Sequence, residues 1–152
     1  MRALLPALLL AAFAGSAAAQ SVDAANPKSV ADALLKLGYR AKLETDSEGD
    51  PVVRSAIEGI DYSVFFYGCN GGKLCKYVVF TASFDLRDGM TLEAINEWNR
   101  AKIIGQAHLD DEMDPHLEYF LTTIGGLNQA NFADAVDWWG VTMAEFKTHI
   151  GW

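Results

Sequence analysis

Cysteine and positive charge are both scarce in this sequence of 152 residues. Its two cysteines are too few for a scaffold built from disulfides or for a structural zinc site made of thiolates. Lys and Arg number 12 against 20 Asp and Glu, a net charge of −8. Such an acidic chain is a poor partner for nucleic acid or an anionic membrane surface. Apolar residues make up 51%, too many for intrinsic disorder, and the length suits a single domain.

Catalytic motifs are missing as well. The sequence has no Gly-x-Ser-x-Gly turn for a serine nucleophile, no His-Glu-x-x-His zinc motif and no glycine-rich phosphate loop. Acidic pairs are frequent, but 20 acidic residues in so short a chain bring carboxylates close together by composition alone. We therefore expect neither enzymatic activity nor a cofactor.

Long apolar runs are missing too, except at the N-terminus. Arg2 precedes an apolar stretch over residues 3–14, and alanines at 17–19 provide the small residues that a signal peptidase accepts before Gln20. The stretch is shorter than the roughly 20 residues of a membrane-spanning helix. We expect residues 1–19 to be a cleaved secretory signal peptide, the protein to be exported, and the mature chain not to insert into a membrane. Cleavage removes one arginine and no acidic residue, which makes the mature net charge −9.

The two cysteines, Cys69 and Cys75, enclose a short turn. Asn70-Gly71-Gly72 lies between two runs of β-branched and aromatic residues, which predicts a hairpin with the cysteines within disulfide range. In an exported protein we expect a structural disulfide. A redox-active pair is the alternative, but the cysteines are not spaced as Cys-x-x-Cys, and no helix N-terminus follows to lower a thiol pKa.

Periodicity in the first half predicts a short helix and four strands. We expect residues 20–26 to be a disordered lead-in and residues 27–152 to form one domain. Asn26 and Pro27 are suited to begin a helix, and Gly38 to end it. Short turns then separate four segments with strand composition, which predicts an antiparallel meander over 40–45, 51–58, 60–67 and 76–84.

The second half predicts a helix, a hairpin and a long final helix. Thr91 is suited to cap the first of these helices, and the hairpin strands are expected over 102–109 and 116–124. The final helix begins after Asn128, and Gly140 bends or divides it, with Thr142 and Glu145 as a capping box. The whole order is α-β4-α-β2-α, an α+β fold with helices packed on an antiparallel sheet.

Residues 96–126 contain a group of positions that together form a motif. These positions are Asn96, Trp98, Asn99, Ala107, Leu109, Asp110, Leu117, Glu118, Gly125 and Gly126. The run resembles the core signature of the YbjN family, bacterial proteins labelled as sensory transduction regulators, and His108 and Met113 stand where the family more often has Tyr and Gly. The resemblance implies a fold like that of the type III secretion chaperones and the periplasm of a Gram-negative bacterium as location, and it supplies no established catalytic residues.

Two histidines flank the acidic turn of the expected hairpin. If they share a sheet face, His108 and His116 could bind zinc or copper together with Asp110 or Asp114. The ordinary interpretation is two exposed imidazoles beside a solvated acidic turn. The turn itself lacks the glycine and the final glutamate of an EF-hand, which argues against calcium.

Tryptophans suggest where a partner could bind. Trp139 belongs to the apolar stripe of the final helix, whereas Trp138 lies about 100° around that helix and should be at least partly exposed. Trp98 and Trp152 are further candidate interface residues. Two interpretations of Trp138 stay open: an interface residue, or a cover for the edge of the sheet.

These patterns lead to one functional expectation and one alternative. We expect a non-enzymatic regulator or accessory factor of the cell envelope that acts by binding another protein, and a homodimer is compatible with this expectation. The alternative is a periplasmic ligand-binding or metal-binding sensor that uses the hairpin of His108 and His116.

Overall fold

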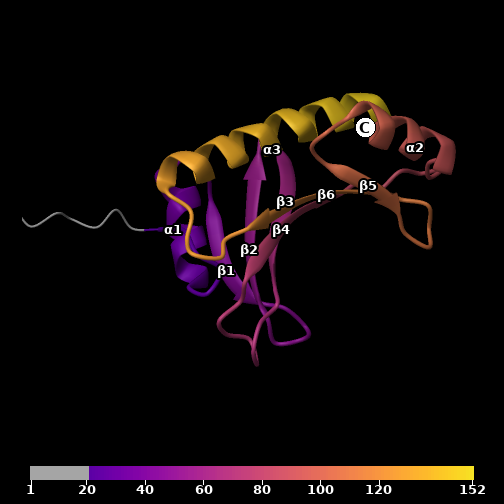
Figure 1. Ribbon diagram of the computed structural model, residues 1–152. Helices are drawn as coiled ribbons and strands as arrows, with labels where there is room; N and C mark the ends of the chain where they lie inside the picture. The colour runs from indigo at the N-terminus through magenta and orange to yellow at the C-terminus, as the bar shows by residue number, and fades with distance from the viewer. Residues whose placement is uncertain (1–20) are drawn as a thin grey trace, which may run out of the picture.

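The computed structural model describes residues 21–152 as three helices and six strands (Figure 1). The predicted signal peptide, residues 1–19, lies outside the described residues. Along the chain the elements are α1 (Pro27–Lys36), β1 (Ala41–Thr45), β2 (Pro51–Ile57), β3 (Ile60–Tyr67), β4 (Tyr77–Ser83), α2 (Leu92–Ala101), β5 (Gln106–Leu109), β6 (Pro115–Thr122) and α3 (Gln129–Ile150).

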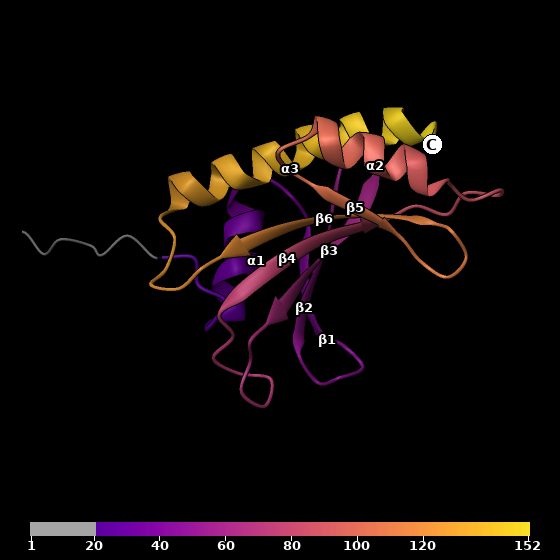
Figure 2. The ribbon, with the colours of Figure 1, turned by 45° about the vertical axis from the view of Figure 1, so that its right-hand side comes forward.

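The six strands form one antiparallel sheet, in the spatial order β1-β2-β3-β4-β6-β5. The first four strands are a meander, as predicted, and β3 and β4 are the central pair. The α+β class is therefore confirmed. The described helices lie on one side of the sheet, and Figure 2 shows the other face with no described helix in front of it.

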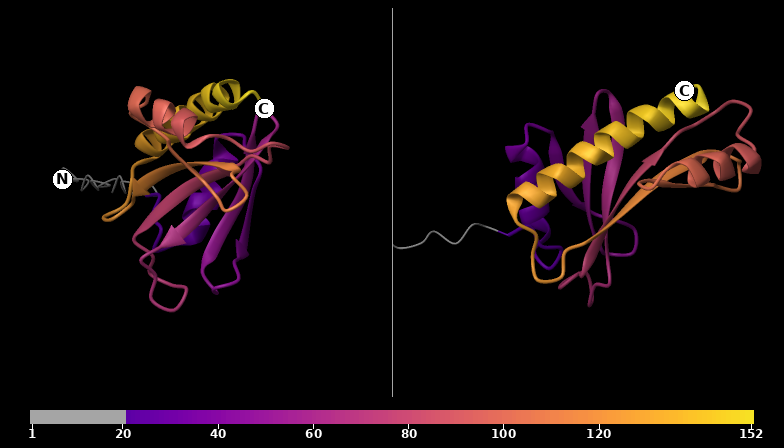
Figure 3. Two further views of the ribbon diagram at one scale, coloured as in Figure 1. Left: turned by 90° about the vertical axis from the view of Figure 1, so that its right-hand side faces the viewer. Right: turned by 45° about the horizontal axis from the view of Figure 1, so that its top comes forward.

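The core lies between α3 and the sheet. Because side chains alternate along a strand, Tyr62, Val64 and Phe66 of β3 point toward the helices and are buried. The apolar stripe of α3 packs against them, with Phe132 and Trp139 fully buried. Figure 3 shows α3 crossing the strands on one side of the sheet.

The expected break at Gly140 does not occur, because α3 is continuous from Gln129 to Ile150. The Thr142 hydroxyl donates to the carbonyl of Trp138 at 2.7 Å, within the helix, and therefore caps no helix end. Glu145 binds the Lys102 ammonium at 2.8 Å instead of a backbone N–H. Packing of the apolar stripe against the core stabilises the helix on both sides of Gly140, so it continues without a break.

The expectation of a disordered lead-in is wrong for residues 21–26. Val22 exchanges two backbone hydrogen bonds with Leu127, at 2.8 and 2.9 Å, and is fully buried. The N–H of Ala24 donates to the Thr123 hydroxyl at 2.9 Å. Two small apolar side chains among polar residues give little sequence signal, so only the structure shows that this segment completes the core.

No helix among residues 21–152 is long and apolar enough to cross a membrane. The two cysteines lie in the β3–β4 loop, just beyond the ends of the strands, and are bonded to each other with their Cα atoms 3.9 Å apart. Cys75 is buried against the core.

Replacing both Cys69 and Cys75 with serine should lower the free energy of unfolding. The chain-entropy model gives about 2.4 kcal/mol for so short a loop. Urea unfolding of the oxidised parent and the double variant measures the difference, with the reduced parent as control. An unchanged midpoint for the double variant would contradict a stabilising role. The oxidised parent should also show no titratable thiol when unfolded without reductant.

Candidate functional site

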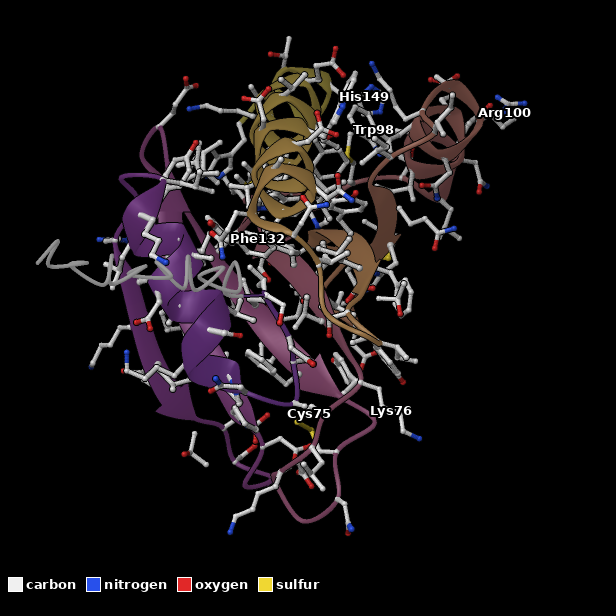
Figure 4. The ribbon with its side chains drawn as sticks, turned by 60° about the vertical axis from the view of Figure 1, so that its left-hand side comes forward. Cys75, Lys76, Trp98, Arg100, Phe132 and His149 are labelled. Carbon is white, nitrogen blue, oxygen red and sulfur yellow. A yellow bond between two sulfur atoms is a disulfide. The ribbon has the colours of Figure 1, made fainter. Side chains whose placement is uncertain are left out.

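Trp98 does not lie on the surface. Its side chain is 2% exposed, and its indole N–H donates to the carbonyl of Gly105 at 2.8 Å. Its ring meets Phe146 of α3 edge-on, with ring centroids 4.8 Å apart. Figure 4 shows Trp98 beside His149, between α2 and α3. The expectation of Trp98 as an interface residue is therefore wrong, because its indole joins α2 to α3 and to the start of β5.

Asn99 completes this junction by closing the outer edge of β5. Its side-chain amide donates to the carbonyl of Ala107 at 2.9 Å, and its side-chain oxygen accepts from the N–H of Ala107 at 2.8 Å. These are the two hydrogen bonds that a further strand would make. The Trp98-Asn99 pair thus fixes α2 on β5 and protects part of this sheet edge from pairing with another chain.

Gly105 sets the place where β5 begins. Its φ is +79°, and a Cβ atom there would lie 2.5 Å from the Thr142 methyl group, so only glycine fits. The chain turns away from β6 at this residue, and β5 starts at Gln106 rather than at the predicted residue 102. Ile103 and Ile104 consequently lie outside the sheet.

The histidine pair lies on one face of the hairpin. His108 and His116 are directly opposite each other, with their rings stacked at 5.1 Å. The His116 ring nitrogens lie 3.2 Å from an Asp110 carboxylate oxygen and 2.8 Å from the Ser83 hydroxyl. The backbone N–H of Asp114, with His116, holds the pKa of Asp110 below its usual value. Asp110 therefore acts as the residue that shapes the turn.

Asp114 does not join the histidines, because its carboxylate accepts from the backbone N–H of Leu86 at 2.9 Å. Within residues 21–152, no group of three His, Cys, Asp or Glu side chains is arranged to hold a metal ion. The geometry therefore brings His108, His116 and Asp110 together without giving support to a metal site.

Trp152 is half-exposed at the end of α3. Its ring meets Phe84 edge-on at 5.3 Å, and the Lys147 ammonium lies over it, 4.9 Å from the centroid. These contacts close the end of the core, so part of the ring has a structural role.

Trp138 is the candidate that the structure leaves on the surface, with 50% of its side chain exposed. It lies on one stripe of α3 with Asp134 and Thr142, one turn away in each direction. Asp134 lies near Tyr119 of β6, whose pKa is raised by burial and also by the Asp134 charge. Thr142, at the other end of the stripe, lies against Gly105. Trp138 therefore lies beside the place where β5 leaves β6.

A groove of about 430 Å³ lies at this place. Ile103, on its wall, is fully exposed, and Phe120 is 57% exposed. Glu118 supplies a carboxylate. We call this the junction groove, and the residues that line it are Val79, Ile103, Ile104, Gly105, Gln106, Glu118, Tyr119 and Phe120.

The sequence did not predict the junction groove. Ile103 and Phe120 were both assigned to hairpin strands, 102–109 and 116–124, where each would have had a neighbour. The available signal was Gly105 directly after two isoleucines, since a glycine inside a strand pattern often marks a break in pairing.

A mixed α+β domain with a single antiparallel sheet is thus the class of protein that the fold defines. The chain belongs to the YbjN family, whose family model is described as "Putative bacterial sensory transduction regulator" and matches residues 26–152. This confirms the resemblance found over residues 96–126. A search of curated proteins gave no significant match, and a search of solved structures gave none either. The likeness to type III secretion chaperones stays a prediction.

Proposed function

We propose that this protein is an exported, non-enzymatic regulator or accessory factor of the bacterial cell envelope. It acts by binding another protein at the surface formed by Trp138 and the junction groove. The observation that carries the proposal is a set of large exposed apolar side chains on either side of one strand edge: Trp138, 50% exposed, on the helix side of the sheet, and Phe120 and Ile103, 57% and fully exposed, at the junction groove. Exposed apolar groups gathered at one place favour a protein interface, and tryptophan is the residue most enriched where binding energy concentrates.

Export is supported by two independent features of the chain. The N-terminal pattern is that of a secretory signal peptide. The bonded pair of Cys69 and Cys75 fits an oxidising compartment, because disulfides are rare in the reducing cytosol. For a member of this bacterial family, the proposed location is the periplasm.

Trp138→Ala tests the binding surface. We expect cross-linking in cells to yield about tenfold less of the bound envelope protein, because loss of a central aromatic side chain costs at least about 1–2 kcal/mol of binding free energy. The matched control is Leu35→Ala on α1, which removes a side chain of similar exposure, 53%, from a helix that packs at the opposite edge of the sheet. Mass spectrometry of the cross-linked products measures the yield.

An unchanged cross-linking yield in Trp138→Ala would reject this surface. Sedimentation of both variants shows whether the bound protein is a second copy of the chain. A saturable calorimetric titration with zinc or copper that depends on His108 would favour the sensor function instead.

A further inference from the structure

Strand β6 is longer than the strand beside it. Its pairing with β4 runs from His116 to Thr122, whereas its pairing with β5 stops at Glu118, opposite Gln106. Residues 119–122 therefore have a hydrogen-bonded neighbour on the β4 side alone. The cause is Gly105, where the chain turns away toward α2.

The bonding of Asn99 shows which backbone groups face this open edge. The backbone N–H and C=O of Ala107 face away from β6 and bond to Asn99. The backbone N–H and C=O groups of Gln106 and His108, the residues on either side, therefore face β6. Their partners Glu118 and His116 in turn direct their backbone N–H and C=O groups toward β5. By the same alternation, the next two residues whose backbone groups face this edge are Phe120 and Thr122.

The opposite side of β6 agrees with this assignment. The N–H of Thr123 donates to the carbonyl of Lys76, and the carbonyl of Pro115 accepts from the N–H of Phe84. The odd-numbered residues of β6 therefore direct their backbone N–H and C=O groups toward β4. Between residues 21 and 152, no loop hydrogen bond takes up the backbone groups of Phe120 or Thr122. Two N–H and two C=O groups are thus available along a stretch with apolar walls.

Unpaired backbone groups in this spacing are complementary to an extended polypeptide, which pairs through its own N–H and C=O groups. The walls select its side chains. Ile103, Val79 and Phe120 favour apolar residues at alternate positions. Among residues 21–152 no Lys or Arg lies within ion-pair distance of Glu118, so its carboxylate favours a cation on the partner.

We infer that an extended, apolar and basic segment of the partner adds as a strand to β6 at Phe120 and Thr122. The segment continues the line of β5, places apolar side chains in the junction groove, and sets a Lys or Arg against Glu118. This inference rests on the proposed function, and it names how the partner binds. A second copy of this chain is disfavoured, because each copy brings a net charge of −8, or −9 after cleavage, and its own Glu118.

Thr122→Pro tests the inference, with Thr122→Ala as the matched control. Proline removes the N–H that faces the open edge and leaves the ladder with β4 intact, because that N–H makes no bond to β4. Alanine removes the side chain and keeps the N–H. The probe is a synthetic acetylated extended peptide that carries valines and then one lysine at alternate positions, with serines between them, because Glu118 and Phe120 lie on the same face of β6. Binding is followed by the amide NMR shifts of the protein.

For the parent chain and Thr122→Ala, we expect saturable binding with the largest shifts at the amides of Phe120 and Thr122. Thr122→Pro should weaken binding by about tenfold or more, since it loses a backbone hydrogen bond and adds a steric block. A peptide with glutamate in place of lysine should bind more weakly to the parent chain. Glu118→Gln should remove this difference between the two peptides.

Equal binding by Thr122→Pro and the parent chain would overturn the inference, and so would shifts confined to other residues. A parent chain that sediments as a dimer and a Thr122→Pro variant that is monomeric would assign the edge to a second copy instead. The cross-linking yields of Trp138→Ala and Thr122→Pro together distinguish failure of this inference from failure of the proposed function. If Trp138→Ala loses the cross-linked partner and Thr122→Pro keeps it, the surface stands and strand addition is rejected; if neither variant changes the yield, the surface itself is rejected.

Discussion

Trp98→Ala should lower the free energy of unfolding by about 3–5 kcal/mol, the cost of truncating a fully packed aromatic side chain. The indole is 2% exposed, and its removal opens a cavity between α2 and Phe146 of α3. It also leaves the carbonyl of Gly105 without the indole donor. Guanidinium unfolding followed by far-ultraviolet circular dichroism measures the loss, because this signal does not depend on tryptophan fluorescence.

The matched control is Trp138→Ala, which removes the same kind of side chain from a position on α3 that is 50% exposed. We expect a loss below about 1 kcal/mol there, as is typical of surface substitutions. Equal losses for the two variants would contradict the assignment of Trp98 to the core and of Trp138 to the surface. The comparison therefore separates a tryptophan that maintains the fold from one that is available to a partner.

Alkaline pH should unfold the protein partly through Tyr62. Burial raises the pKa of Tyr62 to about 12, against 10.0 for an unperturbed tyrosine. The folded state therefore holds the phenol proton more tightly than the unfolded chain does. The resulting stabilisation is complete below pH 10 and is lost as the pH rises to about 12, and this pKa difference corresponds to about 2.7 kcal/mol.

Tyr62→Phe removes that dependence. Phenylalanine keeps the ring contacts with Phe80 and Trp139, at 6.0 and 5.9 Å, and has no proton to lose. We expect the gap in unfolding free energy between the variant and the parent chain to shift in favour of the variant between pH 10 and 12. Urea unfolding across this range measures the shift, and Tyr77→Phe, on the uncovered face of the sheet, controls for the loss of a phenol. A constant gap would contradict the role of Tyr62.

Much of the fold could be predicted because long periodic segments dominate it. The stripe from Phe132 to Ile150 predicts a helix whichever way Gly140 is interpreted, and the high apolar content of 60–67 predicts a central strand. The lead-in could not be predicted, because what orders Val22 is a backbone pairing with Leu127, more than a hundred residues away. A pattern within a short stretch of sequence cannot indicate a contact between residues so far apart.

The candidate site was harder to predict than the fold. Trp138 was correctly placed on the surface from its angle around the helix, since that angle depends on helix geometry alone. Trp98 was misassigned, because an apolar face toward a sheet and one toward a partner have the same periodicity. The junction groove depends on where one strand stops, and strand ends follow from tertiary contacts such as that between Gly105 and Thr142.

The pairing of Val22 with Leu127 has a consequence for the order of events during maturation. A peptidase needs an extended substrate on both sides of the bond that it cuts, and the proposed cut before Gln20 is two residues from a fully buried side chain. If the proposed cleavage before Gln20 takes place, we expect it to precede the pairing of Val22 with Leu127, so that this edge of the core closes after cleavage.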